Sequence, residues 1–289
     1  MSASAKVRTA RGIGDVREAV GRWRNARETV AFVPTMGNLH AGHVSLTELA
    51  ASAADRVIVS IFVNPTQFGP GEDFGAYPRT LDDDVARLAA AGTTDLLFVP
   101  SANEVYPFGL DDAVRVTLPA MSRELDGASR PGHFDGVATV VCRLLNIVAP
   151  DILFLGEKDY QQFKLMERMI GDLRMNVTLQ MGPTMREPDG LAMSSRNRYL
   201  DASQRRDAPL LHATLAQVRD ALRSGESDQG ALEARARERL AQAGFRPDYV
   251  EIRRAVDLAK PGAGAHPDEL IVLGAAWLGR TRLIDNVRV

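Results

Sequence analysis

The chain has 289 residues, of which 45% are hydrophobic and 25% are charged, the ordinary balance of a water-soluble globular protein with room for two domains. Its 35 Lys and Arg residues nearly balance its 37 Asp and Glu residues, so a net charge of −2 gives no reason to expect nucleic acid as a partner. The longest nearly apolar run, residues 57–63, is far shorter than the about 20 residues that cross a bilayer, so no membrane span is expected.

Cysteine content and the N-terminal sequence bear on where the protein works. One cysteine, Cys142, rules out a disulfide within the chain and is compatible with a reducing compartment. Residues 1–20 lack the apolar segment of a secretory signal. We therefore expect a cytoplasmic protein.

Short β-branched runs alternate with helical patterns through the first half of the chain. The sequence predicts strands at residues 29–33, 56–63, 95–99, 151–155 and 176–181. It predicts helices at residues 41–54, 80–91, 136–148 and 159–170. Pro34 is expected to end the first strand. Near-continuous apolar strands separated by helices indicate an α/β, Rossmann-like domain, a parallel sheet with helices on both faces, over residues 1–184.

The pattern changes after about Arg196. Helices are predicted at residues 203–223 and 229–243, and three short strands follow at residues 248–253, 269–275 and 281–286. This order is typical of a smaller α+β domain, which we place at residues 185–289. A smaller C-terminal domain of this kind can act as a lid over a site in the first domain.

The first predicted strand runs into the sequence PTMGNLHAGHVSL, residues 34–46. His40 and His43 stand at a strand-to-helix junction, where Gly37 permits a tight turn and Gly42 a close approach of a ligand. The N-terminus of a helix offers backbone N–H groups to phosphate, and two imidazoles there can donate hydrogen bonds to a triphosphate. A zinc site is the alternative, although zinc usually takes three or four ligands and no cysteine is near.

The second predicted strand leads into NPTQFGPGEDFGAYPR, residues 64–79. Asn64 and Gln67 carry neutral amides that both donate and accept hydrogen bonds. Such groups suit a substrate with hydroxyls and a carboxylate in an otherwise apolar pocket. A Pro/Gly-rich surface loop is the alternative for the same sequence.

Acidic residues follow this segment. Thr80 is expected to cap the helix at residues 80–91, with Asp82, Asp83 and Asp84 in its first turn. Carboxylates there interact favourably with the helix dipole. The same carboxylates are also candidates for holding Mg²⁺, and Asp83 is the metal ligand that we select.

Three later motifs add charge and further amides. GEKDYQQ, residues 156–162, places Lys158 where it can neutralise phosphate charge and Gln162 one helical turn later. MSSRN, residues 193–197, offers two hydroxyls and a guanidinium to β- and γ-phosphates, unless it is simply a polar linker. In RPGHFDGV, residues 130–137, Arg130 either contacts an anionic group or pairs with a carboxylate at a subunit contact. The alternative is a basic loop before a helix cap, and a structural role is expected for His133.

These motifs also carry a family resemblance. His-x-Gly-His and the Met-Ser-Ser-Arg-Asn string resemble the two signatures of the nucleotidyltransferase superfamily, which includes class I aminoacyl-tRNA synthetases. The longer strings in residues 34–46, 64–79 and 156–162 resemble the motifs of the pantothenate synthetase family, in the same order. The resemblance implies ATP-dependent ligation of pantoate and β-alanine through a pantoyl-adenylate, with release of AMP and pyrophosphate. It further implies Mg²⁺ and a homodimer.

The resemblance also implies residue roles. ATP binding would involve Pro34, Thr35, Met36, Gly37, His40, Gly42, His43, Gly156, Glu157, Lys158, Asp159, Met185, Met193, Ser194, Ser195 and Arg196. The catalytic set within these would be His40, His43, Lys158, Ser194, Ser195 and Arg196. Pantoate would be bound by Gln67, Gln162, Asn64 and Met36, with Gln67 also near β-alanine. Met185 is a mild departure, because many members of the family carry valine there.

Two other functions fit parts of the pattern. An adenylyltransferase acting on a phosphorylated cofactor precursor would share the first and last motifs but would not need the paired glutamines. A non-catalytic nucleotide sensor or an RNA-binding relic of a synthetase is more distant, and the near-neutral charge argues against RNA. Without the resemblance, the residue chemistry indicates only ATP-dependent activation of a small polar acid.

Overall fold

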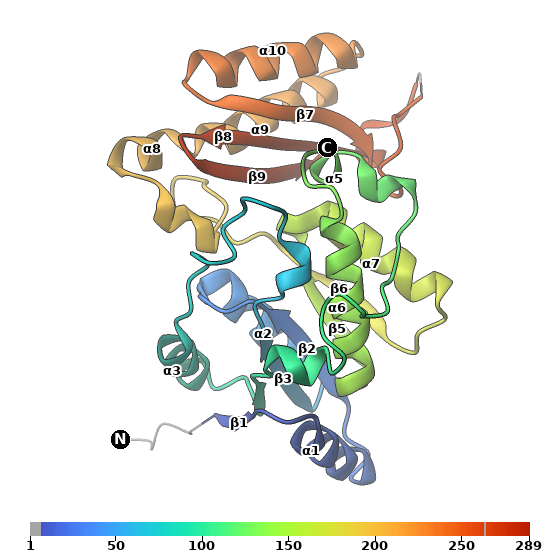
Figure 1. Ribbon diagram of the computed structural model, residues 1–289. Helices are drawn as coiled ribbons and strands as arrows, with labels where there is room; N and C mark the ends of the chain where they lie inside the picture. The colour runs from blue at the N-terminus through green and yellow to red at the C-terminus, as the bar shows by residue number, and fades with distance from the viewer. Residues whose placement is uncertain (1–6, 263) are drawn as a thin grey trace. The chain divides into compact units, whose positions relative to one another are not determined.

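A computed structural model of the protein covers residues 7–262 and 264–289 (Figure 1). The chain forms two compact units: unit 1 contains the described residues up to Glu157 and Leu165–Pro183, and unit 2 contains Lys158–Lys164 and Thr184–Val289. The first six residues, part of the stretch in which no secretory signal is expected, lie outside the described residues. In the two described ranges, no helix is both long enough and apolar enough to cross a membrane.

Unit 1 is built on a parallel sheet of six strands in the order β1-β4-β3-β2-β5-β6. The strands are β1 (Arg8–Ala10), β2 (Val30–Thr35), β3 (Arg56–Ile61), β4 (Leu96–Phe98), β5 (Ile152–Gly156) and β6 (Thr178–Gly182). The central residues of β2, β3, β4 and β5 are buried, which explains the near-continuous apolar runs of these strands. The predicted α/β fold with a parallel sheet is confirmed.

Helices make up much of the rest of unit 1. They are α1 (Ile13–Asn25), α2 (Ala41–Ala53), α3 (Leu81–Ala91), α4 (Ala102–Val105), α5 (Asp126–Ser129), α6 (His133–Val148) and α7 (Tyr160–Asp172), whose first five residues group with unit 2. Short 3₁₀ turns are η1 (Pro65–Gln67), η2 (Ala120–Arg123) and η3 (Glu157–Asp159). Leu46 and Ala50 of α2 and Leu88 of α3 pack in one cluster with alternate residues of β2, β3 and β4. Helices α1, α2 and α6 contact the strands of the sheet. Helix α6 contacts strand β2 of the sheet, and helix α1 contacts α6.

Two local expectations for unit 1 were wrong, those for Pro34 and for the start of α6, whereas the N-cap position predicted for Thr80 is confirmed. Pro34 lies inside β2, and the strand tolerates it because β5 pairs with β2 only as far as Phe32, so Pro34 has a strand neighbour on one side only. Thr80 occupies the N-cap position of α3, but its side chain makes no cap hydrogen bond. α6 begins at His133, three residues before the predicted start.

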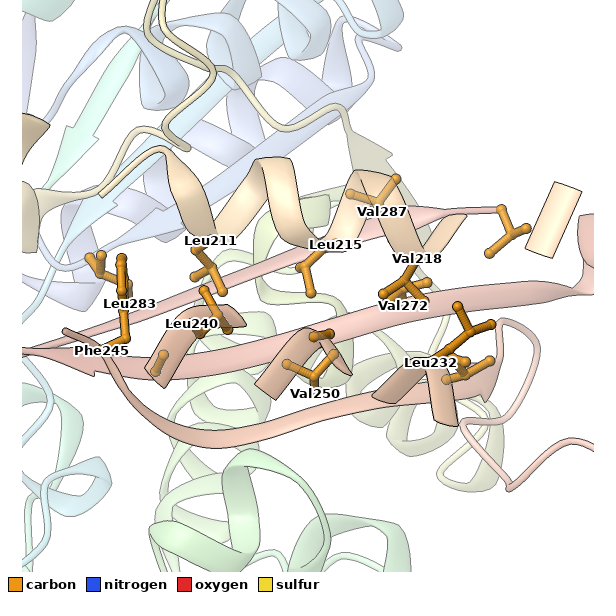
Figure 2. Packing of buried hydrophobic residues seen from close by; sticks show 14 of the residues in the cluster. Leu211, Leu215, Val218, Leu232, Leu240, Phe245, Val250, Val272, Leu283 and Val287 are labelled. Atoms are coloured by element: carbon orange, nitrogen blue, oxygen red, sulfur yellow. The ribbon is translucent and has the colours of Figure 1, made fainter. Parts of the chain in front are cut away.

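Unit 2 combines helices with an antiparallel sheet in the order β7-β8-β9. Its elements are η4 (Ser195–Tyr199), α8 (Ala202–Asp207), α9 (Leu210–Arg223), α10 (Gln229–Gln242), β7 (Arg246–Arg254), η5 (Pro267–Glu269), β8 (Leu270–Leu278) and β9 (Thr281–Arg288). Apolar side chains of α9 and α10 pack on the sheet; Figure 2 shows Leu215 of α9, Leu240 of α10 and Val272 of β8 in this core. The single helix predicted at residues 203–223 is two helices, because Pro209 has no N–H to continue the first one and instead caps the second.

Candidate active site

The sheet of unit 1 has a topological switch point at β2. The chain continues from β2 to β3 on one side, whereas β5 pairs with β2 on the other side. In open parallel sheets, ligands bind beyond the carboxyl ends of the strands at such a point. β2 leads into the His40 loop, and β5 ends at Gly156 and leads into Glu157. Two motifs that were selected from the sequence therefore leave the sheet from neighbouring strands.

His40 and His43 lie together at the start of α2, with ring centroids 4.1 Å apart. His40 is the N-cap residue, and its Nδ1 accepts the Gly42 N–H at 3.2 Å. The Nδ1 of His43 accepts the His40 N–H, also at 3.2 Å. Because each Nδ1 accepts a backbone hydrogen bond, each neutral ring carries its proton on Nε2 and can donate from that atom.

The zinc alternative has no support in the parts of the chain that the structure describes. No group of three or more His, Cys, Asp or Glu side chains in residues 7–262 and 264–289 is arranged to hold a metal ion. The histidine pair instead satisfies the first turn of its own helix.

Asp84 fixes the loop that precedes this pair. It is only 1% exposed, and its two carboxylate oxygens accept the N–H groups of Asn38 at 2.9 Å and Leu39 at 2.7 Å. Gly37 has φ +82°, and a Cβ there would lie 3.1 Å from Asp84 Oδ2. The tight turn expected at Gly37 is therefore present, and it lets the loop close onto Asp84. The three acidic residues of α3 do not act alike, since Asp82 and Asp83 are exposed.

Gln67 lies in η1, directly after β3, and is 8% exposed. Its Oε1 accepts the Asn64 Nδ2 at 3.1 Å, and its Nε2 donates to the Met36 sulfur at 3.0 Å. Met36 comes from the loop after β2, so residues that follow two neighbouring strands meet at this point. Three of the residues selected for pantoate are thus brought into direct contact.

The amide of Asn64 is satisfied within the protein. Its Nδ2 also donates to Gly136 O at 3.2 Å, and its Oδ1 accepts from the Tyr106 hydroxyl at 2.8 Å and the Thr66 hydroxyl at 3.1 Å. Asn64 is only 1% exposed. Because both polar atoms of the Asn64 side chain already have partners within the protein, Asn64 is better suited to holding Gln67 than to contacting a substrate. We call Met36, Asn64, Thr66, Gln67, Tyr106 and Gly136 the Gln67 cluster.

Gly136 of α6 was not selected from the sequence, yet it determines how close η1 lies to that helix. A Cβ at this position would lie 2.2 Å from Thr66 O and 2.9 Å from Gln67 Cα. No side chain larger than hydrogen fits without moving η1. No clear signal was present in the sequence, because the helix was predicted to begin at Gly136, and only its actual start at His133 places this glycine inside the helix.

A chain of three side chains holds the backbone of Gln67. Glu72 accepts two hydrogen bonds from the Arg130 guanidinium, at 2.8 and 2.6 Å. The Nη1 of Arg130 lies 2.8 Å from His133 Nε2, and His133 Nδ1 lies 2.7 Å from Gln67 O. Since a guanidinium only donates, Nε2 is the acceptor and Nδ1–H donates to Gln67 O. Arg130 therefore pairs with a carboxylate, but that carboxylate belongs to the same chain, whereas the expected pairing was at a subunit contact.

Charge states follow from this arrangement. Burial lowers the pKa of His133 to about 4, and the neighbouring Arg130 charge adds to the effect, so the ring is neutral near neutral pH. Burial alone would raise the pKa of Glu72, but hydrogen bonds and charge from Arg130 outweigh burial and lower it. The structural role expected for His133 agrees with these contacts.

The remaining motif residues belong to unit 2. Lys158 and Asp159 lie in η3, with Lys158 Nζ 3.6 Å from Asp159 Oδ1, and Gln162 is half-buried in the first turn of α7. Ser194 is the N-cap residue of η4, and its hydroxyl accepts the Arg196 N–H at 3.3 Å. Met185 is exposed and pairs through its carbonyl with the Met193 N–H at 2.9 Å.

Residues selected for one site are thus divided between the two units. Within unit 1 the structure brings together the histidine pair, and separately Met36, Asn64 and Gln67. Within unit 2, Met185 and Met193 are joined, and Ser194 contacts Arg196. The joint action of Gln67 with Gln162, and of the histidines with Arg196, remains a prediction.

Comparisons with known proteins address the activity. The family model described as "Pantoate-beta-alanine ligase" matches residues 8–288. The pantothenate synthetase of Thioalkalivibrio sulfidiphilus is 54% identical, with 94% of each chain covered, and that of Pseudomonas aeruginosa is 51% identical, with 97% of this chain and 98% of the relative covered.

Solved structures give the same result. The pantothenate synthetase of Thermus thermophilus superposes with a TM-score of 0.90 at 42% identity, covering 98% of this chain and 99% of that one. A pantoate-β-alanine ligase from Francisella tularensis, complexed with Beta-gamma ATP and β-alanine, gives a TM-score of 0.80 at 35% identity, covering 98% and 97% of the two chains. The described fold, the ordered motifs and these matches over nearly the whole length show that the chain belongs to the pantoate–β-alanine ligase family.

Proposed function

We propose that the protein joins pantoate to β-alanine with the consumption of ATP. In the first step a carboxylate oxygen of pantoate attacks the α-phosphorus of ATP, the bond to the β-phosphate oxygen breaks, and pyrophosphate leaves. In the second step the amine of β-alanine attacks the acyl carbon of the pantoyl-adenylate, AMP leaves, and the amine loses a proton. The observation that carries this proposal is the family match over residues 8–288, together with the Francisella relative complexed with Beta-gamma ATP and β-alanine.

The chemistry requires charge stabilisation more than proton abstraction. Pantoate's carboxylate is ionised near neutral pH and attacks without a general base. Positioned hydrogen-bond donors around the phosphates supply most of the catalysis in transfers of this kind. We assign this role to His40 and His43, whose Nε2 atoms carry the proton, and to Lys158, Ser194, Ser195 and Arg196. His43 is the residue that we expect to donate a proton and to contact the triphosphate.

We assign pantoate to Gln67 and Met36 of the Gln67 cluster and to Gln162, with Asn64 holding Gln67 in place. The Gln67 amide is fixed on both of its atoms by Asn64 and Met36, so its orientation is set before a substrate arrives. The cluster is rich in apolar and amide groups, which suits a substrate with a branched carbon skeleton, hydroxyls and one carboxylate. The same glutamine is proposed to lie near β-alanine.

Mg²⁺ is proposed to accompany ATP. Mg²⁺ keeps several waters and is usually bound by one or two carboxylates together with phosphate oxygens. The exposed carboxylate of Asp83, in the first turn of α3, fits such a donor set, whereas Asp84 is occupied by the loop backbone. When bound, the ion would neutralise charge on the phosphate oxygens.

Two further proposals concern the assembly of the protein and the compartment in which it works. We propose a homodimer that works in the cytoplasm, where a single cysteine stays reduced. Sedimentation of the purified protein checks the first part, since a monomer at assay concentration would contradict it. The alternative activity, adenylylation of a phosphorylated cofactor precursor, is not favoured, because the curated relatives cited above are pantothenate synthetases.

The experiment is exchange of labelled pyrophosphate into ATP, with Mg²⁺ and pantoate present and β-alanine absent. We expect exchange that requires pantoate, because adenylation is reversible, and formation of AMP once β-alanine is added. We expect His43→Ala to lose exchange by a factor of about 10² or more. His266→Ala, at an exposed histidine, is the matched control and should exchange normally. Folded protein that binds ATP but shows no exchange with pantoate would contradict the proposal.

A further inference from the structure

Two adjacent polar residues, Asp285 and Asn286, are buried in strand β9 of unit 2. Successive side chains of a strand point to opposite faces of its sheet. Leu283 and Val287 lie in the core formed with α9 and α10 (Figure 2), so Asp285 shares that face and Asn286 points to the other. The two residues therefore reach different segments of unit 2.

Asp285 holds the segment before Ser194. Arg186 donates two hydrogen bonds to its carboxylate, from Nη1 at 2.6 Å and from Nη2 at 2.9 Å. The same guanidinium donates to Gly190 O at 3.1 Å, across the hairpin that the Met193 N–H closes onto Met185 O. This pair fixes the hairpin whose last residue directly precedes the Ser194–Arg196 turn.

Asn286 holds the other segment. Its Nδ2 donates to Lys158 O at 3.0 Å. Two residues later in the chain, the Tyr160 hydroxyl donates to Ala255 O at 2.8 Å and lies 3.3 Å from Nη2 of Arg288. Arg288 is on the same face of β9 as Asn286, two positions along. The backbone of residues 158–160 is thus tied to this strand.

We propose that Asp285 and Asn286 are positioning residues, which hold two nucleotide-binding segments on one strand. The inference rests on the proposed function, which assigns Lys158 and the Ser194–Arg196 turn to ATP. Neither residue touches the phosphates; each acts through a neighbour. Groups that stabilise charge at phosphorus are effective only when they are fixed in place before the reaction, and a rigid strand that holds both segments provides this.

The charge state of Asp285 is consistent with this role. Burial raises the pKa of its carboxyl, but the nearby His212 ring and the hydrogen bonds and charge of Arg186 reverse the effect and keep the pKa below its ordinary value. The groups that face Asp285 are Arg186, the backbone N–H of Asn286 at 2.8 Å, and His212 of α9, whose Nδ1 lies at 3.5 Å. The carboxylate therefore stays ionised and keeps its hold on Arg186 across neutral pH.

The test uses Asn286→Ala and Asn286→Asp, which both remove the donor to Lys158 O, and Val287→Ala as the matched control. Val287 is the next residue of the same strand and packs in the apolar core, so its truncation weakens β9 without touching Lys158. In pyrophosphate exchange, we expect the two Asn286 variants to raise the KM for ATP about fivefold to tenfold. The KM for pantoate should stay within about twofold of the parent value.

Binding of α,β-methylene ATP, measured by calorimetry, separates this inference from the proposed function. If the parent protein shows no pantoate-dependent exchange, the proposed function fails, but the calorimetric Kd of the variants still decides the inference. A Kd in Asn286→Asp equal to that of the parent overturns it. So does an equal rise of both KM values, because a general loss of structure would produce that result. Asn286→Asp keeps the size of the side chain and remains informative if Asn286→Ala fails to fold.

Discussion

The two units fix their site residues with different chemistry. In unit 1, Gln67 is held by neutral groups. The Asn64 amide contacts its side chain and is itself held by the Tyr106 hydroxyl, and the neutral His133 ring contacts its backbone. The ion pair Glu72–Arg130 is partly exposed and lies at the far end of the contacts that reach Gln67 through His133. In unit 2, the segment before Ser194 is held by the Arg186–Asp285 pair, in which the Asp285 side chain is only 3% exposed.

This difference predicts how each region responds to change. Neutral amides and hydroxyls are buried at modest cost when each hydrogen bond is made, so the loss of one partner is tolerated within a few kcal/mol. A buried carboxylate depends on its cation, and the loss of one partner leaves an uncompensated charge. Neutral imidazole adds a response to pH that the carboxylate pair lacks near neutrality. Four measurements test this difference between the two units.

The largest effect is expected for Asp285→Ala. The variant leaves the partly buried Arg186 guanidinium without its carboxylate, and we expect the free energy of unfolding to fall by about 4 kcal/mol. The double variant Arg186→Met, Asp285→Leu should lose much less, because it removes both charges together. Urea unfolding followed by circular dichroism measures both values. A loss below about 1 kcal/mol in the single variant would mean that the pair contributes no more than a surface ion pair.

His133 gives the next largest effect, through pH. The unfolded chain takes up a proton at this residue below its ordinary pKa of 6.5, whereas the folded chain does so only near 4. The unfolded state binds more protons in this window, so the free energy of unfolding should fall as the pH drops from about 6.5 to about 4, by about 3 kcal/mol in total. Above about pH 6.5 the contribution is complete.

His133→Asn removes this titration and keeps an N–H near the position that donates to Gln67 O. Its unfolding free energy, measured by urea at a series of pH values, should decline less steeply than that of the parent between about pH 6.5 and pH 4. The pKa of Glu72 is lowered, so that residue loses its contribution only toward the acid end of the series. Parallel curves for the parent and His133→Asn would refute the account of a buried neutral ring.

Gly136→Ala is expected to have a smaller effect, concentrated on one substrate. The new Cβ meets Thr66 O at 2.2 Å, and η1 must move away with Gln67. We expect a loss of about 2 kcal/mol in stability and a rise of about tenfold or more in the KM for pantoate, with little change for ATP. Gly21→Ala in α1, where a Cβ meets nothing within 4 Å, is the matched control and should be neutral or slightly stabilising. An equal response of both substrates would disconnect Gly136 from Gln67.

How much the sequence could predict depended on the range of the contacts involved. The sheet strands were predictable because both of their faces are buried and their apolar runs are continuous. β1 has only three residues and escaped notice, as did α1, whose sequence IGDVREAVGRWRN mixes charge with few apolar positions. The break at Pro209 could have been predicted, because proline removes the N–H that a continuous helix needs.

The positions of the motifs of the candidate site were predictable, and the residues that support them were not. His40, His43 and Gln67 lie in strings that follow strands, so position and chemistry agree. Tyr106 and Gly136 contact Asn64 from 42 and 72 residues away, and no local pattern indicates such a pairing. The Asn286 contact with Lys158 O spans 128 residues. A sequence motif identifies the groups that meet a ligand, whereas the groups that orient them are defined only by the packed fold.

The smallest effect on stability, and the sharpest test of the metal, is expected for Asp83→Asn. Asp83 is exposed in the first turn of α3, so its neutralisation should change the free energy of unfolding by less than about 0.5 kcal/mol. If its carboxylate contributes to Mg²⁺ binding, the Mg²⁺ concentration that half-saturates pyrophosphate exchange should rise severalfold. Asp82→Asn, an exposed neighbour in the same turn, is the matched control and should leave the Mg²⁺ titration unchanged. Equal shifts in the two variants would indicate a general electrostatic effect, and no shift in either would leave Mg²⁺ to the phosphates and water alone, because Asp84 already serves the His40 loop.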